Sequence, residues 1–122
     1  MTKDNALFAW FQQFSIPFYP STELPEKPIF PYGTYEPVFG YFGDEVYPTV
    51  NIYDLTDSED KINGYADELG KAIGKGGAVV ECDEGAFWIK RGSPFVQGIN
   101  DPDNANVKRR LISIAIEYLT TD

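Results

Sequence analysis

The residue types in this chain best suited to chemistry are carboxylates, and four of them lie close together: Asp54, Asp57, Glu59 and Asp60. Paired carboxylates can hydrolyse glycosides when they face each other across a cleft and one of them has a raised pKa. Acids at the expected start of a helix have a simpler explanation, because they cap the first turn and interact favourably with the helix dipole. We therefore interpret this acidic group as structural.

A single cysteine is the other reactive residue, and the chain of 122 residues contains no histidine. Without histidine there is no Ser-His-Asp or Cys-His system and no imidazole proton shuttle. One thiol also cannot supply a zinc site. Cys82 precedes two acids, Asp83 and Glu84, whose charges raise a thiol pKa. We expect Cys82 to be a half-buried, inert thiol.

Two loops resemble ligand-binding motifs but depart from the patterns. The glycine-rich segment 74–77 would need the first glycine of a phosphate loop at Leu69, and it ends a helix instead of opening one. Residues 100–106 place Ala105 and Asn106 where a calcium loop needs an oxygen ligand and a glycine. We interpret the first loop as a helix end and the second as a solvated turn, with a weak hard-cation site as the alternative.

The charge is strongly acidic, with 19 Asp and Glu against 10 Lys and Arg, a formal net charge of -9. Such a balance argues against wrapping nucleic acid, because that affinity comes mainly from neutralising phosphates. Half of the basic residues form two short clusters: Lys90, Arg91, Lys108, Arg109 and Arg110. These clusters form either a solvated face or one half of a subunit contact that meets the acids Asp57, Glu59 and Asp60 of the next copy head to tail.

The chain is expected to fold as one domain, residues 1–122, with an amino-terminal arm that differs in composition from the rest. Seven of the nine prolines lie at or before Pro48, interleaved with aromatic residues. Prolines at this density disfavour long helices and central strands, so we expect residues 15–47 to form an extended arm or long loops. Its aromatic residues, such as Phe39, Tyr41 and Phe42, either patch the core or contact a partner.

Two helices are predicted by apolar periodicity. The first covers about residues 4–14, and Pro17 stops it. The second begins at a capping box, Thr56 to Glu59, in which each side chain satisfies a backbone NH. Its apolar stripe then runs from Ile62 to Ile73, and glycines end it.

The strands are predicted by alternation of apolar and polar residues over 46–55, 78–82, 86–90, 95–99 and 106–120. A hairpin with Gly85 at positive φ joins the second and third of these strands. The element order gives an α+β fold, a mainly antiparallel four- to five-stranded sheet with two helices packed on one face.

Residues 48–120 resemble the small tail-terminator, or tail-to-head joining, proteins of long-tailed bacteriophages, which are also described as minor capsid or minor tail proteins. The resemblance rests on the order and spacing of these pieces: Pro48–Tyr53, Thr56–Glu59, Gly77, Asp83–Ile89, Gly92–Gln97, Asp101–Asp103 and the strand that ends at Glu117–Tyr118.

The resemblance implies a structural virion protein with no enzymatic activity and no cofactor. Such a protein assembles as a hexameric ring on the head-proximal end of the tail tube, stops tube growth and meets the head connector, and DNA passes through without specific binding. It would be found in the virion and, during assembly, in the host cytoplasm, with no membrane partner. The alternative is a small aromatic-rich module that binds a carbohydrate or a peptide.

Overall fold

The computed structural model describes residues 1–100, 103–104 and 106–121. The elements follow in the order α1 (Lys3–Phe11), β1 (Phe18–Pro20), a short 3-10 helix (Ser21–Glu23), β2 (Tyr32–Tyr35), β3 (Glu45–Val46), β4 (Thr49–Leu55), α2 (Glu59–Ile73), β5 (Ala78–Cys82), β6 (Gly85–Asn100) and β7 (Val107–Thr120). Residues 101, 102 and 105 of the predicted turn over 100–106, and with them much of its cation-site alternative, lie outside the described residues. None of the described helices is both long and apolar enough to cross a membrane.

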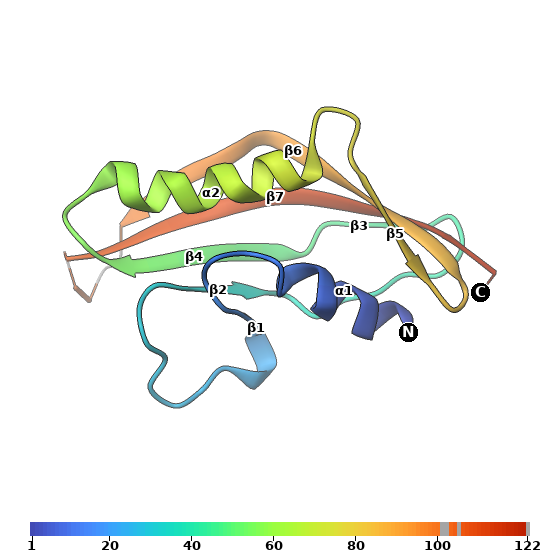
Figure 1. The fold of residues 1–122 in the computed structure, drawn as a ribbon, viewed down its shortest axis with the longest axis horizontal. Coiled ribbons are helices and arrows are strands. Elements are labelled where there is room, and N and C mark those ends of the chain that lie inside the picture. The colour runs from blue at the N-terminus through green and yellow to red at the C-terminus, as the bar shows by residue number, and fades with distance from the viewer. Residues whose placement is uncertain (101–102, 105, 122) are drawn as a thin grey trace.

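The strands form one curled sheet in the order β1-β2-β4-β7-β6-β5, with β3 pairing with β7 beyond the end of β4 (Figure 1). The pair β1 and β2 is parallel and every other pair is antiparallel. The α+β class is confirmed, but the prediction of four to five strands is wrong because the sheet has seven.

The additional strands lie in the arm that was expected to be irregular. Proline restricts β1 and β2 only at their ends, since Pro20 is the last residue of β1 and Pro31 immediately precedes β2. All four residues of β2 are buried. The arm therefore extends the sheet at one edge, and its long loops are confined to residues 24–31 and 36–44.

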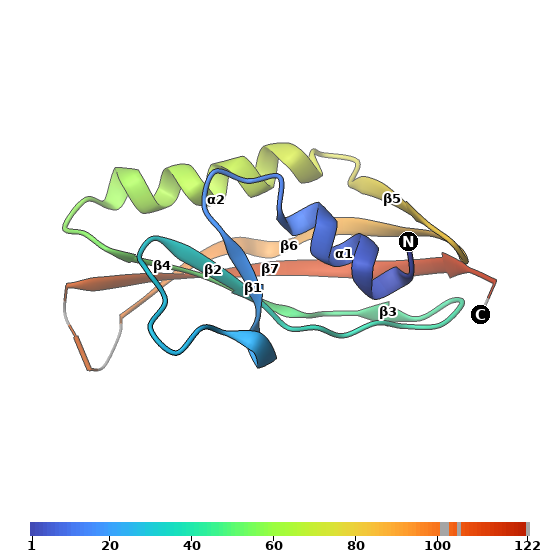
Figure 2. The ribbon, with the colours of Figure 1, turned by 60° about the horizontal axis from the view of Figure 1, so that its bottom comes forward.

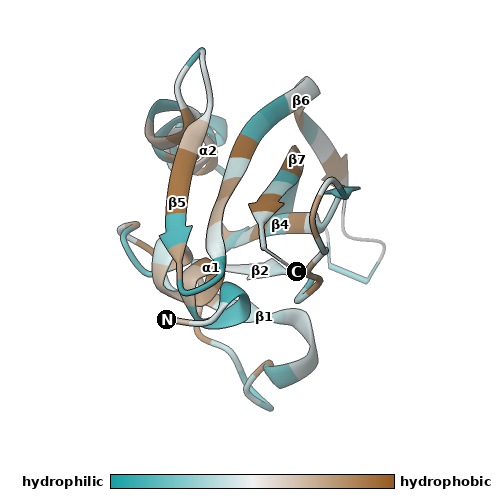
Figure 3. Cartoon of the chain, turned by 90° about the vertical axis from the view of Figure 1, so that its right-hand side faces the viewer, coloured by the Kyte–Doolittle hydropathy of each residue, from teal (hydrophilic) through white to brown (hydrophobic). Residues whose placement is uncertain are grey.

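Both helices contribute to one hydrophobic core on the inner side of the curl, as the views in Figures 2 and 3 show. The inward residues of β7 are the predicted set, Ile112, Ile114, Ile116 and Tyr118, each at most 3 % exposed. The apolar stripe of α2 covers them with Ile62, Ala66, Leu69 and Ile73. Among the described residues, no α-helix lies on the opposite, convex face of the sheet (Figure 2).

The helix boundaries correct two details of the predictions. Helix α1 begins at Lys3 with Thr2 as its N-cap and ends at Phe11, well before Pro17. Helix α2 is capped by Ser58, whose hydroxyl accepts from the Lys61 backbone NH, and not by a Thr56–Glu59 box. The reason is that the Glu59 carboxylate points to basic side chains of β7 instead of back to the backbone.

Strand β6 joins the two strands predicted at 86–90 and 95–99 into one. It pairs with β7 along its length, with a register shift between Arg91 and Val96. Strand β5 pairs only with Gly85–Ile89 of β6, and Gly85 has the predicted positive φ of 138°. Within the described residues, the outer edge of β6 beyond Ile89 therefore has no strand partner.

Candidate functional site

The predicted contact between acids and bases is partly made within one chain. Glu59, at the start of α2, lies 2.8 Å from the Lys108 ammonium and also pairs with the Arg110 guanidinium. Arg110 is 8 % exposed and donates to the Asn63 side-chain oxygen as well. The Lys108 ammonium, with the Arg110 guanidinium, holds the pKa of Glu59 below its usual range. This network closes the end of the core where α2 begins.

Two further bases of the predicted clusters also have partners in the same chain. The Lys90 ammonium lies 3.3 Å from the Glu45 carboxylate, across the strands. Arg109 points to the convex face, where it donates to the Asn51 side-chain oxygen at 2.9 Å and lies over the Tyr53 ring. Of the five bases in the two clusters, only Arg91 has no polar partner among the described residues.

Arg91 instead lies with two lysines that the sequence reasoning did not select. Lys71 and Lys75, near the carboxyl end of α2, line a groove of about 320 Å³ together with Arg91 and Phe95. We call this the α2–β6 groove; Ala66, Asp67, Gly70 and Gly74 complete its lining. Lys71 lies in the last turn of α2 and Lys75 lies just beyond its C-cap Gly74, so their nearness in the sequence was the available signal.

The remaining acids of the predicted site, Asp57 and Asp60, are exposed at the other end of α2. Neither makes an ion pair within the part of the chain that the structure describes. They flank the Glu59 network and follow Leu55, which is 52 % exposed. The end of α2 opposite the groove thus presents acids beside an exposed apolar side chain.

The predicted aromatic residues Phe39, Tyr41 and Phe42 lie in the loop between β2 and β3 and are 51 %, 59 % and 72 % exposed. This loop is held by Lys3, which the sequence reasoning missed. The buried Lys3 ammonium donates to the Gly40 carbonyl at 3.0 Å and lies 4.5 Å from the Tyr41 ring centroid. A lysine facing an aromatic-rich loop gives no periodic signal, because the contact spans 37 residues of sequence.

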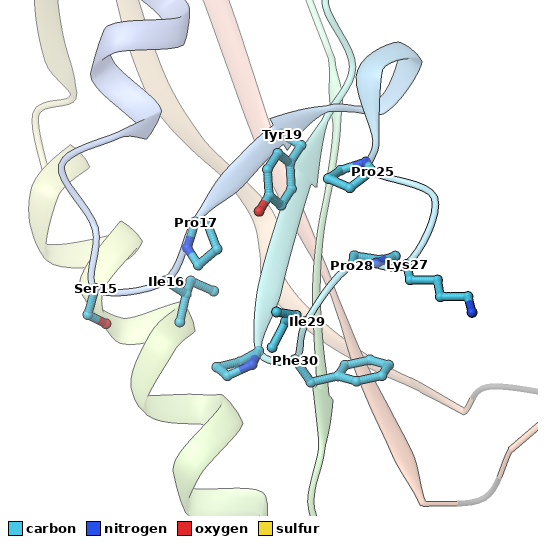
Figure 4. A pocket seen from close by; sticks show the side chains of 10 residues that line it. Ser15, Ile16, Pro17, Tyr19, Pro25, Lys27, Pro28, Ile29 and Phe30 are labelled. Carbon is cyan, nitrogen blue, oxygen red and sulfur yellow. The ribbon is translucent and has the colours of Figure 1, made fainter.

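The arm supplies a second aromatic group, on the convex face. Tyr32 stacks on Tyr53 with 5.1 Å between centroids, and Phe30 and Tyr19 lie against Tyr32. Beside them a pocket of about 450 Å³ is lined by prolines and by the ring of Tyr19 (Figure 4). Ile29, at its rim, is 83 % exposed. All four of these rings are at least half buried, so part of the arm packs on the sheet, as one of the two interpretations expected.

The described residues include acids, one cysteine and tyrosines as side chains able to bind a metal ion or transfer a proton. No three acids or cysteines among them gather closely enough to bind a metal ion. Burial raises the pKa of Tyr118 and of Tyr35 to about 12, which makes these phenols poor proton donors near neutral pH. Burial raises the pKa of the Cys82 thiol, the direction predicted from the sequence; the Glu84 side chain adds to this rise and hydrogen bonds with the backbone of Glu84 and Gly85 oppose it.

Comparison of the chain with protein-family models, with curated proteins and with solved structures finds no match.

Proposed function

We propose that this protein is a structural subunit that forms a ring, hexameric as the resemblance implies, at the head-proximal end of a phage tail. There it terminates the tail tube and joins it to the head connector. The observation that carries the proposal is where the family-like pieces lie in the fold. They form β4, the start of α2, the β5–β6 turn, the shift in β6 and the end of β7, which belong to one sheet and one helix packed around a single core.

The surface supports an assembly role. The exposed loop aromatics lie at one end of the molecule, and Phe42 is the most exposed of them. Around α2, the bases Lys71, Lys75 and Arg91, unpaired in the described chain, lie near its carboxyl end, and the unpaired acids Asp57 and Asp60 lie at its amino end. Contacts that join different patches on neighbouring copies generate rings when the rotation closes.

The acidic balance fits a ring through which DNA passes. A chain with a formal charge of -9 gives a strongly negative ring when several copies assemble. DNA passing through a lumen of the same sign is repelled from the wall instead of adsorbed.

Light scattering on the purified protein and electron microscopy of the protein mixed with tail tubes test the proposal. The expected result is rings in solution or capped tube ends. A protein that stays monomeric at high concentration and never binds tubes would contradict it. Neighbouring genes for a connector, a major tail protein and a tape measure are expected as well.

A second candidate function, a carbohydrate- or peptide-binding module, is favoured by the aromatic group on the convex face and the adjoining proline-lined pocket. Tyr19 and Phe30 line this pocket and present ring faces suited to stacking on a sugar or on a proline-rich peptide. A glycan array and a peptide array with no hits would dispose of it.

A further inference from the structure

We propose that the α2–β6 groove receives the segment Leu55–Asp60 of a second copy of this chain, so that neighbouring subunits join through opposite ends of α2. This inference rests on the proposed ring function and names its contact. It shares Arg91 with the contact predicted from the sequence but replaces the other predicted bases by Lys71 and Lys75.

This groove gathers most of the basic side chains that have no polar partner in the described chain. Six of the ten basic side chains have a polar partner in the described chain: Lys3, Lys61, Lys90, Lys108, Arg109 and Arg110. Three of the other four, Lys71, Lys75 and Arg91, line this one groove. Asp67 is the only carboxylate in the lining, so the groove keeps an excess of positive charge on an otherwise acidic protein.

The shape of the groove indicates what it can hold. Its floor is apolar, because Ala66 is buried in the core, the partly buried Phe95 packs against the core, and Gly70 lets the Phe95 ring approach the helix closely. Lys71, Lys75 and Arg91 also line the groove. The complementary ligand is therefore an apolar side chain flanked by carboxylates.

The segment Leu55–Asp60 has this chemistry. Leu55 is 52 % exposed at the end of β4, and Asp57 and Asp60 are exposed next to it. Glu59 between them is already paired with Lys108 and Arg110, which fixes the backbone of this turn and leaves the two aspartates outward.

The distance between the two surfaces makes the contact head to tail. Asp60 and Lys71 are 11 residues apart along α2, about 16 Å at 1.5 Å per residue. A subunit therefore cannot satisfy its own groove with its own aspartates. The backbone edge of β6 beyond Ile89, unpaired in the described chain, runs beside Arg91 and offers further hydrogen bonds to an incoming extended segment.

Paired charge reversals test the contact. A groove variant carries Lys71→Glu and Lys75→Glu, and a turn variant carries Asp57→Lys and Asp60→Lys. Each alone is expected to weaken self-association at least about tenfold, measured by analytical ultracentrifugation. An equimolar mixture of the two is expected to assemble again, because each groove then meets a turn of opposite sign. Circular dichroism checks that each variant folds, and neutral variants (Lys71→Gln with Lys75→Gln, Asp57→Asn with Asp60→Asn) replace any that does not.

The control variant carries Glu23→Lys and Glu26→Lys, an equal charge change in the arm, and is expected to assemble like the unmodified protein. If the groove and turn variants assemble normally while the unmodified protein forms rings or caps tubes, the inference is wrong and the ring function stands. If the control fails to assemble while the turn variant assembles normally, the occupant of the groove is the arm, which also overturns the inference. An unmodified protein that neither associates nor binds tubes overturns the ring function itself.

Discussion

Lys3 stabilises the aromatic loop between β2 and β3 through a buried hydrogen bond and cation–π contacts. Its buried ammonium donates to the Gly40 carbonyl and lies within 6.0 Å of the rings of Tyr41, Phe39 and Tyr118. We expect Lys3→Met to lower the free energy of unfolding by about 1–3 kcal/mol, because both the hydrogen bond to a charged donor and the cation–π contacts are lost. Urea unfolding measures the change. Lys27→Met, at an exposed lysine, is the control and is expected to stay within about 0.5 kcal/mol; an equal loss in both variants would contradict this role of Lys3.

Glu59 makes stability depend on pH at the start of α2. Its pKa lies below the ordinary value of 4.5 in the folded chain, because Lys108 and Arg110 favour the carboxylate. The stabilisation is therefore complete above pH 4.5 and is lost as the pH falls through the lower folded value. We expect the urea midpoint of Glu59→Gln to lie below that of the unmodified protein at pH 7, with the gap closing towards pH 3. Asp60→Asn, which removes no ion pair known in the described chain, is the matched control, and a gap that does not change with pH would argue against the network.

At the scale of elements, β2 depends on a glycine that leaves room for a core ring. A Cβ at Gly33 would overlap the ring of Phe18, which is 1 % exposed on the neighbouring strand β1. We expect Gly33→Ala to destabilise the fold by about 1–3 kcal/mol through overpacking. Gly64 in α2 has open space around its Cβ position. Gly64→Ala is therefore expected to stabilise by about 0.5–1 kcal/mol through helix propensity. Thermal unfolding of both variants measures these changes. If both substitutions shift the melting temperature in the same direction, the packing argument is wrong.

The elements differ in how completely the sequence determined them. Helix α2, β7 and the β5–β6 hairpin have long apolar periods and strong turn residues, and all three are confirmed. The strands β1 and β2 were missed because they are three and four residues long and are buried through pairing with distant segments. A strand this short has too few alternations to stand out among prolines.

At the scale of the whole molecule, salt distinguishes a charged subunit contact from an apolar one. The proposed contact joins exposed cations to exposed carboxylates, and charges in water are screened beyond about 8 Å at physiological ionic strength. We therefore expect association to weaken steadily as sodium chloride is raised, with the melting temperature of the unassembled subunit changing little. Sedimentation at several salt concentrations measures this. Association that strengthens with salt would indicate that the aromatic loop, and not the charges, forms the contact.

The sequence by itself determined the chemical limits and the core of this protein. It showed that histidine is absent, that the charge is -9 and that α2 and β7 have apolar faces, because these depend on residue identity and local spacing alone. Only the tertiary structure decided which charges meet. It paired Glu59 with Lys108 and Arg110, Lys90 with Glu45, and brought Arg91 beside Lys71 and Lys75. These ion pairs join side chains dozens of residues apart in the sequence. The charges that remain unpaired, and so can contact a partner, are therefore known only from the folded structure.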